Sequence, residues 1–215
     1  MERVDRPLPA PKQARSELST SRLLDAAADL IAEGGYERMT LSAIAKRAGY
    51  THGLVTSRFG SKEGLLWALV ERMVVDWSHT LLLPTVSGQT AAAAIHTSID
   101  ALRDSWRRAP SRMRALYILM FEALMPIPLL HQRMAELHRD LRRSVQDAVE
   151  RGISDGSLSG RIDSARVARL IVGALRGAVY QAMLDPDEVS LDDALVDVQT
   201  MVDAILPEPS HTPDR

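Results

Sequence analysis

The residues best suited to chemistry lie in a short cationic stretch, residues 38–62. This stretch holds five basic residues, one histidine and no aspartate or glutamate, although the whole chain has a net charge of −2. The basic residues are Arg38, Lys46, Arg47, Arg58 and Lys62. A local cationic face on an otherwise acidic chain is typical of binding to the phosphates of nucleic acid. The alternative is a basic surface that is only solvated.

Hydroxyl side chains stand where three predicted helices begin. Thr40, Thr51 and Ser61 each precede a helical segment, and Lys62 follows Ser61 directly. A hydroxyl at this position caps the helix, while the free N–H groups nearby attract a phosphate oxygen. We therefore expect contacts that position the chain on DNA without reading its sequence. Such caps would also suit any helical protein.

Two short helices separated by a tight turn at residues 48–51 predict a helix-turn-helix. In the second helix, Val55 and Phe59 are four residues apart and are expected to pack inward. A recognition helix reads base edges in the major groove, for which hydroxyls, an imidazole and an apolar group are suitable. Gly53 would allow DNA to approach the backbone closely. The side chains expected to face DNA are His52, Leu54, Thr56, Ser57 and Arg58. The alternatives are a surface role for His52 and, for Arg58, a bridge to an acidic group on the first helix.

The elements around this motif are predicted to be helical throughout. Apolar residues recur at three- and four-residue spacing, strand alternation is absent, and glycine or proline separates the segments. We expect an all-α chain of about nine helices. The predicted segments are 20–33, 41–48, 52–58, a long helix from 62, and 89–108, 111–125, 128–152, 164–184 and 190–205.

Composition limits the classes of protein to which the chain can belong. With 215 residues, 46% of them hydrophobic and 25% charged, the chain can form a packed core. It has no cysteine, which excludes disulfides, thiolate metal sites and a cysteine nucleophile, and fits a cytoplasmic protein. No apolar run approaches the roughly 18 residues of a membrane span, and the N-terminus lacks the apolar stretch of a signal peptide. We expect no association with membranes.

Motifs of catalysis and metal binding are missing from the sequence. It contains no Gly-rich phosphate loop, no Gly-x-Ser-x-Gly and no clear pair of carboxylates in an apolar setting. His131 and His138 are seven residues apart, without the further ligands that a metal site needs. We therefore predict a protein that is not an enzyme and has neither cofactor nor metal. A helical enzyme is the rival hypothesis.

A string of residues between 22 and 69 is specific when taken together. It consists of Leu24 to Ala27, Gly35-Tyr36, Thr40 to Ala45, Ala48-Gly49, Gly53 and Phe59 to Leu66. With these residues the segment resembles the N-terminal domain of the TetR family of transcriptional regulators. The resemblance implies a three-helix DNA-binding domain, joined by a fourth helix to a helical core that binds a ligand and dimerises. Where the family usually has tyrosine before a histidine and the phenylalanine, this chain has Thr56-Ser57-Arg58, so Thr56 or Arg58 is expected to contact DNA instead.

This organisation divides the chain into four parts. We predict a flexible arm at 1–18, the DNA-binding domain at 19–66, the ligand-binding and dimerisation domain at 67–206 and a flexible tail at 207–215.

Residues for the ligand and for the dimer are predicted in the C-terminal part. Methionines and aromatic residues adapt to apolar ligands, although at helical spacing they also form ordinary core. The candidates for an organic ligand are Trp106, Tyr117, Met120, Phe121, Met125 and Met134. In similar proteins the last two helices pair with those of a second subunit, although these helices could also form only a monomer core. The candidates for the dimer interface are Leu170, Ala174, Ala178, Leu195, Val198 and Val202.

The sequence thus predicts a homodimeric repressor that is released from a palindromic operator in double-stranded DNA by a small hydrophobic or amphipathic ligand. A ligand-independent DNA-binding or adaptor protein of the same fold is the alternative. Activation instead of repression also stays open, because the direction depends on where the operator lies.

Overall fold

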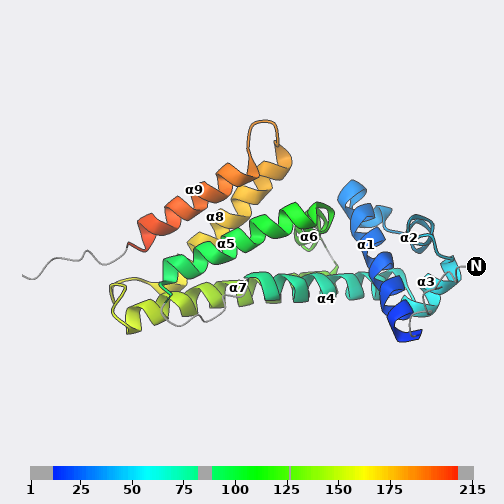
Figure 1. Cartoon of the computed structure of the whole chain (residues 1–215), viewed down its shortest axis with the longest axis horizontal. Coiled ribbons are helices and arrows are strands. Elements are labelled where there is room, and N and C mark those ends of the chain that lie inside the picture. The colour runs from blue at the N-terminus through cyan, green and yellow to red at the C-terminus, as the bar shows by residue number, and fades with distance from the viewer. Residues whose placement is uncertain (1–11, 82–88, 126, 208–215) are drawn as a thin grey trace, which may run out of the picture. The chain divides into compact units, whose positions relative to one another are not determined.

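The computed structural model describes residues 12–81, 89–125 and 127–207. Within these ranges the chain forms nine helices and no β-strand (Figure 1), so the all-α prediction is confirmed. The helices are α1 (Lys12–Arg38), α2 (Leu41–Ala48), α3 (His52–Phe59), α4 (Lys62–Leu81), α5 (Ala91–Arg108), α6 (Pro110–Glu122), α7 (Pro128–Ser154), α8 (Ser164–Leu184) and α9 (Leu191–Ile205).

The chain divides into two compact units, residues 1–71 and 72–215. Helix α4 is continuous across this boundary, so residues 62–71 of α4 belong to the first unit and its remaining residues to the second. A helix shared in this way is a direct covalent connection between the two units.

Helix α1 begins earlier than the sequence pattern indicates. The predicted arm of residues 1–18 is helical from Lys12 onward, and residues 1–11 lie outside the described part. Residues 14–18 are all exposed, and Leu18 is 54% exposed. Because exposed residues show no apolar periodicity, the sequence pattern could not indicate that this segment is helical. At the other end, Gly34 and Gly35 leave helical geometry where a stop was expected, and Gly35 has φ 74°.

Helices α2 and α3 form the expected helix-turn-helix. The turn depends on Gly49, whose φ of 74° lies in the left-handed region that favours glycine. The backbone N–H of Tyr50 donates to the Ala45 carbonyl at 2.9 Å and secures the end of α2. On the inner faces, Ile44 and Val55 are fully buried. They belong to a core whose other fully buried members are Leu23, Ala27, Ala28, Ile31, Met39, Leu65 and Leu69.

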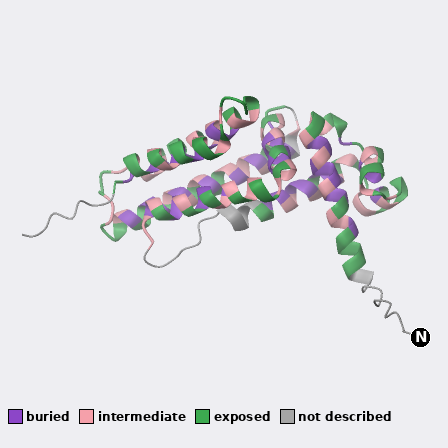
Figure 2. Cartoon of the chain, turned by 45° about the horizontal axis from the view of Figure 1, so that its top comes forward, coloured by how far each residue is buried: buried purple, intermediate pink, exposed green. Residues whose placement is uncertain are grey.

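In the second unit, helices α5, α7, α8 and α9 form a bundle. Helix α8 packs against α7 and α9, and α5 packs against the same two helices. Helix α6 contacts α5 and α7. Figure 2 shows buried residues alternating with exposed ones along these helices, as expected for amphipathic helices that share a core. The fully buried residues of this second core include Ala115, Leu119, Val149, Val179, Leu195 and Val202.

Side-chain caps and prolines set the starts of these helices. Thr90 accepts a hydrogen bond from the Ala93 N–H at 3.2 Å, and Asp163 accepts one from the Arg166 N–H at 2.9 Å. Pro110 and Pro128 stand in the first turns of α6 and α7. A backbone N–H there has no partner within the helix, so proline, which lacks this group, costs no hydrogen bond. The predicted bounds of 164–184 for α8 agree with the structure, and those of α9 differ by one residue.

Helix α8 is also the most apolar long helix among the described residues. Its 21 residues include an 18-residue window of mean hydropathy 1.3, which would suffice to cross a membrane by length and composition alone. Core helices pass the same criterion, and 44% of that window is buried inside the chain. The sequence contains no uninterrupted apolar run of this length because arginines such as Arg169 and Arg176 divide the helix.

Candidate nucleic-acid interface and ligand cavity

Helix α3 presents a polar face to solvent. His52, Thr56 and Ser57 are exposed, Leu54 is half-buried, and Val55 on the opposite side is fully buried. The hydroxyl of Thr51 caps the helix by accepting a hydrogen bond from the Leu54 N–H at 3.3 Å. The cap and the buried valine hold α3 in place, so its polar side chains are available to a partner.

Thr56 and His52 lie one turn apart and are close to each other. The Thr56 hydroxyl donates to the His52 carbonyl at 3.1 Å, and its oxygen lies 3.4 Å from His52 Nδ1. A hydroxyl that donates within its helix keeps acceptor capacity for another group. This pair can therefore offer both an oxygen acceptor and an imidazole to a base edge.

Gly53, in the first turn of α3, lies beside open space. A Cβ added there would meet no atom of the chain within 4 Å. Its backbone is helical, so neither packing nor a positive φ requires glycine. This openness agrees with the expected close approach of DNA.

The predicted phosphate-binding hydroxyls at 40 and 61 act as helix caps. Thr40 accepts from the Ala43 N–H at 3.1 Å, and Ser61 accepts from the Gly64 N–H at 3.1 Å. Both residues are exposed, which leaves them accessible to a phosphate oxygen. Glu63 adds a negative charge beside Ser61, and its pKa is lowered by hydrogen bonds from its own backbone and from the Ser61 hydroxyl.

Two basic residues of the cationic stretch are engaged by side chains of α1. Arg47 donates to both carboxylate oxygens of Glu33, at 2.5 and 2.8 Å. Lys62 Nζ lies 3.9 Å from the centre of the Tyr36 ring and 3.9 Å from a carboxylate oxygen of Glu37. These pairs reduce the positive field of the stretch. Sequence reasoning missed them because their acidic partners precede residue 38.

Arg58 turns toward the N-terminal half of α1. Its guanidinium donates to the Ser19 hydroxyl at 2.8 Å, and also to the Thr20 hydroxyl and the Ser16 carbonyl. The expected alternative to a phosphate contact was an acidic group on the first helix. The observed partners do lie on that helix, but they are neutral.

A cavity of about 460 Å³ lies among α6, α7 and α8. Four of the six predicted ligand residues line it, namely Tyr117, Met120, Phe121 and Met134. The other two do not. Trp106 packs edge-on against Tyr117 with ring centres 6.1 Å apart, and Met125 is 62% exposed outside the lining.

Basic residues also line this cavity, and sequence reasoning did not assign them to it. They are His131, His138, Arg139, Arg142 and Arg176. Spacing along α7 suggested that the histidines share a face, but nothing in the sequence indicated that Arg176 on α8 would join them. Arg176 Nη1 donates to the Tyr117 hydroxyl at 2.9 Å, while burial raises the pKa of Tyr117. The Tyr117 hydroxyl therefore stays protonated.

His138 titrates far from its usual range. Burial lowers its pKa to about 4, with further lowering by the charges of Arg176 and Arg142. At neutral pH the His138 imidazole is therefore uncharged. The described residues contain no group of three or more histidine, aspartate or glutamate side chains arranged to hold a metal ion.

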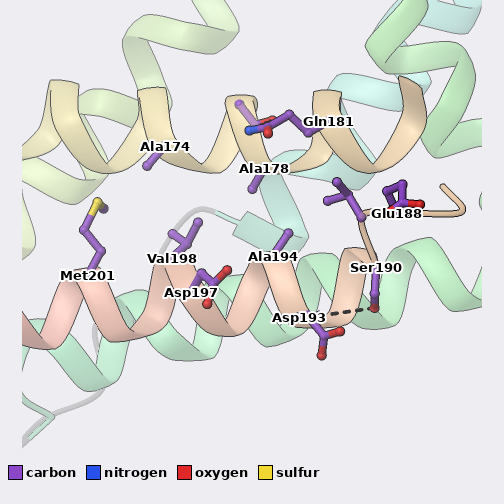
Figure 3. Close-up of a pocket in the computed structure, with 12 residues that line it drawn as sticks. Ala174, Ala178, Gln181, Glu188, Ser190, Asp193, Ala194, Asp197, Val198 and Met201 are labelled. Atoms are coloured by element: carbon purple, nitrogen blue, oxygen red, sulfur yellow. Dashed lines mark hydrogen bonds between the residues drawn. The ribbon is translucent and has the colours of Figure 1, made fainter. Parts of the chain in front are cut away.

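A second hollow, of about 590 Å³, lies between α8 and α9 (Figure 3). Ala174, Ala178 and Val198 line it, and all three were predicted to lie at a dimer interface. Leu170 is 48% exposed. Leu195 and Val202 have no exposed surface, so they belong to the chain's own core and offer nothing for a second chain to cover.

Helix α8 also carries two glycines that the chain leaves uncovered: Gly173 is exposed, and half-buried Gly177 lines the hollow between α8 and α9. A Cβ added to Gly173 or Gly177 would meet nothing within 4 Å. The chain's own packing therefore does not explain glycine at either position. Small residues at uncovered positions of a helix let another helix approach closely.

Comparisons with known proteins place both parts of the chain. Residues 23–69 match the model of bacterial regulatory proteins of the tetR family. Residues 91–207, more than half of the chain, match the C-terminal domain of BetI-type transcriptional repressors. The transcriptional regulator BetI of Burkholderia cenocepacia is 28% identical over 181 residues, which cover 81% of this chain and 90% of that protein.

Solved structures share the fold. A TetR-family regulator from Rhodococcus sp. superposes with a TM-score of 0.77 at 20% identity, covering 88% of this chain and 99% of that one. The structure of SmeT in complex with triclosan superposes with a TM-score of 0.74 at 23% identity, covering 92% of this chain and 98% of SmeT. These families and relatives are transcriptional regulators and not enzymes. The chain accordingly belongs to the TetR family of bacterial regulatory proteins and is a DNA-binding transcriptional regulator with a C-terminal domain of the BetI type.

Proposed function

We propose that this regulator binds a palindromic operator as a homodimer and leaves it when a small amphipathic molecule occupies the cavity among α6, α7 and α8. The observation that carries the proposal is the exposed face of α3. There His52, Thr56 and Ser57 stand on a capped helix within a stretch that contains no acidic residue. Base edges in the major groove are read by side chains of these types.

The proposal of a dimer follows from the shortness of α3. One helix of eight residues contacts too few bases to select a site, whereas two on a twofold axis match two half-sites about 34–36 Å apart, or a multiple of that distance. The hollow between α8 and α9 would form part of the interface, because Gly177 and Ala174 in its lining, and Gly173 on α8, allow another helix to approach closely. Leu170 and Val196, which are 48% and 51% exposed, add apolar area.

The proposal of a ligand follows from the cavity. Its volume of about 460 Å³ lies within the range of sites for small organic molecules, and its walls include methionine and aromatic side chains. The structural neighbour SmeT is described in complex with triclosan, which supports a small-molecule site in a protein of this fold.

Release from DNA would proceed by a shift between two conformations of the dimer. Because α4 belongs to both units, a change at its C-terminal part can reach the DNA-binding unit through the helix itself. A 100-fold loss of operator affinity requires about 2.7 kcal/mol of coupling, which is an ordinary value for allostery. The ligand must bind one conformation more tightly by at least this amount.

The experiment begins by selecting bound duplexes from a random pool with the full-length protein. Affinity for the selected duplex should fall steeply with salt. Lys62→Ala should lower affinity for all duplexes similarly, whereas Thr56→Ala should change preference at particular base pairs. Arg161→Ala is the matched control, since this exposed arginine lies in the loop between α7 and α8. Unchanged operator binding by both interface variants would contradict the proposed contacts.

A further inference from the structure

The charged side chains lining the cavity among α6, α7 and α8 are all basic. Arg139, Arg142 and Arg176 line it together with His131 and His138, and none of the described lining residues is an aspartate or glutamate. The chain as a whole has a net charge of −2. The cavity therefore differs from the rest of the chain in its charge.

Two of the arginines of α7, Arg139 and Arg142, line this cavity without a salt bridge to a described carboxylate, although the charge of Arg139 still reaches Glu136 and lowers its pKa. On the same helix, the Glu136 carboxylate forms its ion pair with Arg133, at 3.0 Å. Neither Arg139 nor Arg142 has an ion pair among the described residues. Arg142 is half-buried. A partly buried charge without a counter-charge is unfavourable, and an anion in the cavity would relieve that cost.

His138 lies close enough to arginines of this cavity for their charges to lower its pKa. Its pKa is lowered to about 4 by burial first, and then by Arg176 and Arg142. The charges of arginines from two different helices, α7 and α8, therefore reach the same imidazole. A ligand in contact with His138 would experience the same potential.

The remaining lining is apolar. Met120, Phe121 and Leu124 contribute from α6 and the turn that follows it, and Met134 from α7. Phe121 and Leu124 are 48% and 79% exposed, so apolar surface is available for a ligand to cover. A cavity with a cationic part and an apolar part matches a molecule that carries a negative head on an apolar body.

We propose that the effector is an amphipathic anion whose acidic head lies among Arg139, Arg142 and Arg176 and whose body covers the methionine and aromatic wall. This inference rests on the proposed function, because it names the chemical class of the molecule that the same cavity receives. Guanidinium groups match a carboxylate in planar, two-point geometry. A cation of the same shape would be repelled, and a neutral molecule would gain no charge-assisted hydrogen bond from these arginines.

The test compares head groups on one apolar chain. Binding of decanoate, 1-decanol and decyltrimethylammonium to the full-length protein is measured by calorimetry without DNA, each below its micelle-forming concentration. Decanoate should bind at least about tenfold more tightly than either of the others, since charge-assisted hydrogen bonds from arginine to a carboxylate are stronger than those to an alcohol and cannot form to a trimethylammonium group. Octanoate and dodecanoate, with matching trimethylammonium compounds, repeat the comparison at other lengths.

Variants then locate the head group. Arg142→Gln should lower decanoate affinity at least about tenfold and leave decanol unchanged. Arg143→Gln, an exposed neighbour outside the lining, should leave both unchanged. Arg142→Lys keeps the charge and should retain part of the affinity, which separates loss of charge from loss of folding.

The outcomes separate this inference from the proposed function. The inference is overturned if, at every chain length, the trimethylammonium compound binds as tightly as the carboxylate, or if no carboxylate binds. It is also overturned if Arg142→Gln binds decanoate like the parent chain. Operator release is measured separately. A carboxylate that binds through Arg142 but leaves the operator complex intact would support the anion site and contradict the ligand-released repressor.

Discussion

Single side chains on α3 divide into those that the protein uses internally and those that it leaves to a partner. Arg58 belongs to the first group, since its guanidinium donates to Ser16, Ser19 and Thr20 of α1. His52 and Ser57 are exposed and belong to the second. The family's usual tyrosine is absent at this part of α3, so the choice of operator bases depends on these smaller groups.

Arg58→Ala is expected to act mainly on stability. Hydrogen bonds from a charged donor contribute about 1.5–3 kcal/mol each when buried, and Arg58 is only half-buried, so we expect a loss of about 1–2 kcal/mol in the free energy of unfolding. Denaturant unfolding measures this loss. The slope of log affinity for DNA against log salt should stay unchanged.

If Arg58→Ala instead reduces the slope of log affinity against log salt by about 1, without a change in stability, then Arg58 contacts a phosphate. Lys46→Ala is a suitable comparison, since this exposed residue of α2 lies in the same cationic stretch.

His138 should make stability depend on acidity. Its pKa is lowered from 6.5 to about 4 in the folded chain, so the unfolded chain binds the proton more readily. Stability is then unaffected above pH 6.5 and declines as the pH falls from 6.5 toward 4. The midpoint of thermal unfolding, measured across this range, should fall less in His138→Gln than in the parent chain. Equal pH profiles of the two proteins would show that His138 is not desolvated as described.

At the scale of helices and turns, two glycines of the helix-turn-helix should respond oppositely to alanine. Gly49 has φ 74°, whereas Gly53 lies in a helix, and a Cβ at either position would meet nothing within 4 Å. Gly49→Ala should destabilise the domain by about 1–2 kcal/mol because of backbone strain alone. Gly53→Ala should stabilise it by up to about 1 kcal/mol.

In Gly53→Ala, affinity for DNA and stability should change in opposite directions. The added methyl group occupies the space through which DNA approaches the backbone, so operator affinity should fall although the fold is more stable. Thermal unfolding and operator titration of the same preparation check both expectations. Unchanged operator affinity in Gly53→Ala would remove Gly53 from the interface.

Helices were predictable from this sequence where apolar periodicity, caps and prolines coincide. Asp163 and Asp185 bound α8, and the predicted range 164–184 agrees with its observed range. The first turns of α1 carry no buried face, so their helical state left no pattern in the sequence. The exposed face of α3 followed from the expected burial of Val55, because side chains are spread around a helix and those far from Val55 point away from the core.

The cavity was predictable only in part. Its methionine and aromatic residues could be proposed from their type, and four of the six do line it. Its arginines could not, since charged residues on a helix usually face solvent. Only the packing of α7 against α8 places Arg176 at the same cavity as Arg139 and Arg142.

At the scale of the whole molecule, the surface of α8 around Gly177 offers a test of assembly. Gly177→Leu adds a side chain to a position at which the chain's own packing leaves open space, so folding should be retained. If a second chain packs against this surface, the added volume should shift the protein from dimer to monomer and weaken operator binding. Sedimentation at several concentrations gives the assembly state. Gly160→Leu is the matched control, because Gly160 also has open space but lies in the loop before α8. A dimer that withstands Gly177→Leu would place the interface elsewhere.

The most direct measurement titrates the full-length protein onto the selected palindromic duplex and onto a scrambled duplex of equal length, at moderate ionic strength. Two chains should bind each selected duplex, and the protein should prefer the selected site at least about a thousandfold. Equal affinity for the two duplexes would contradict the claim that paired α3 helices read base edges.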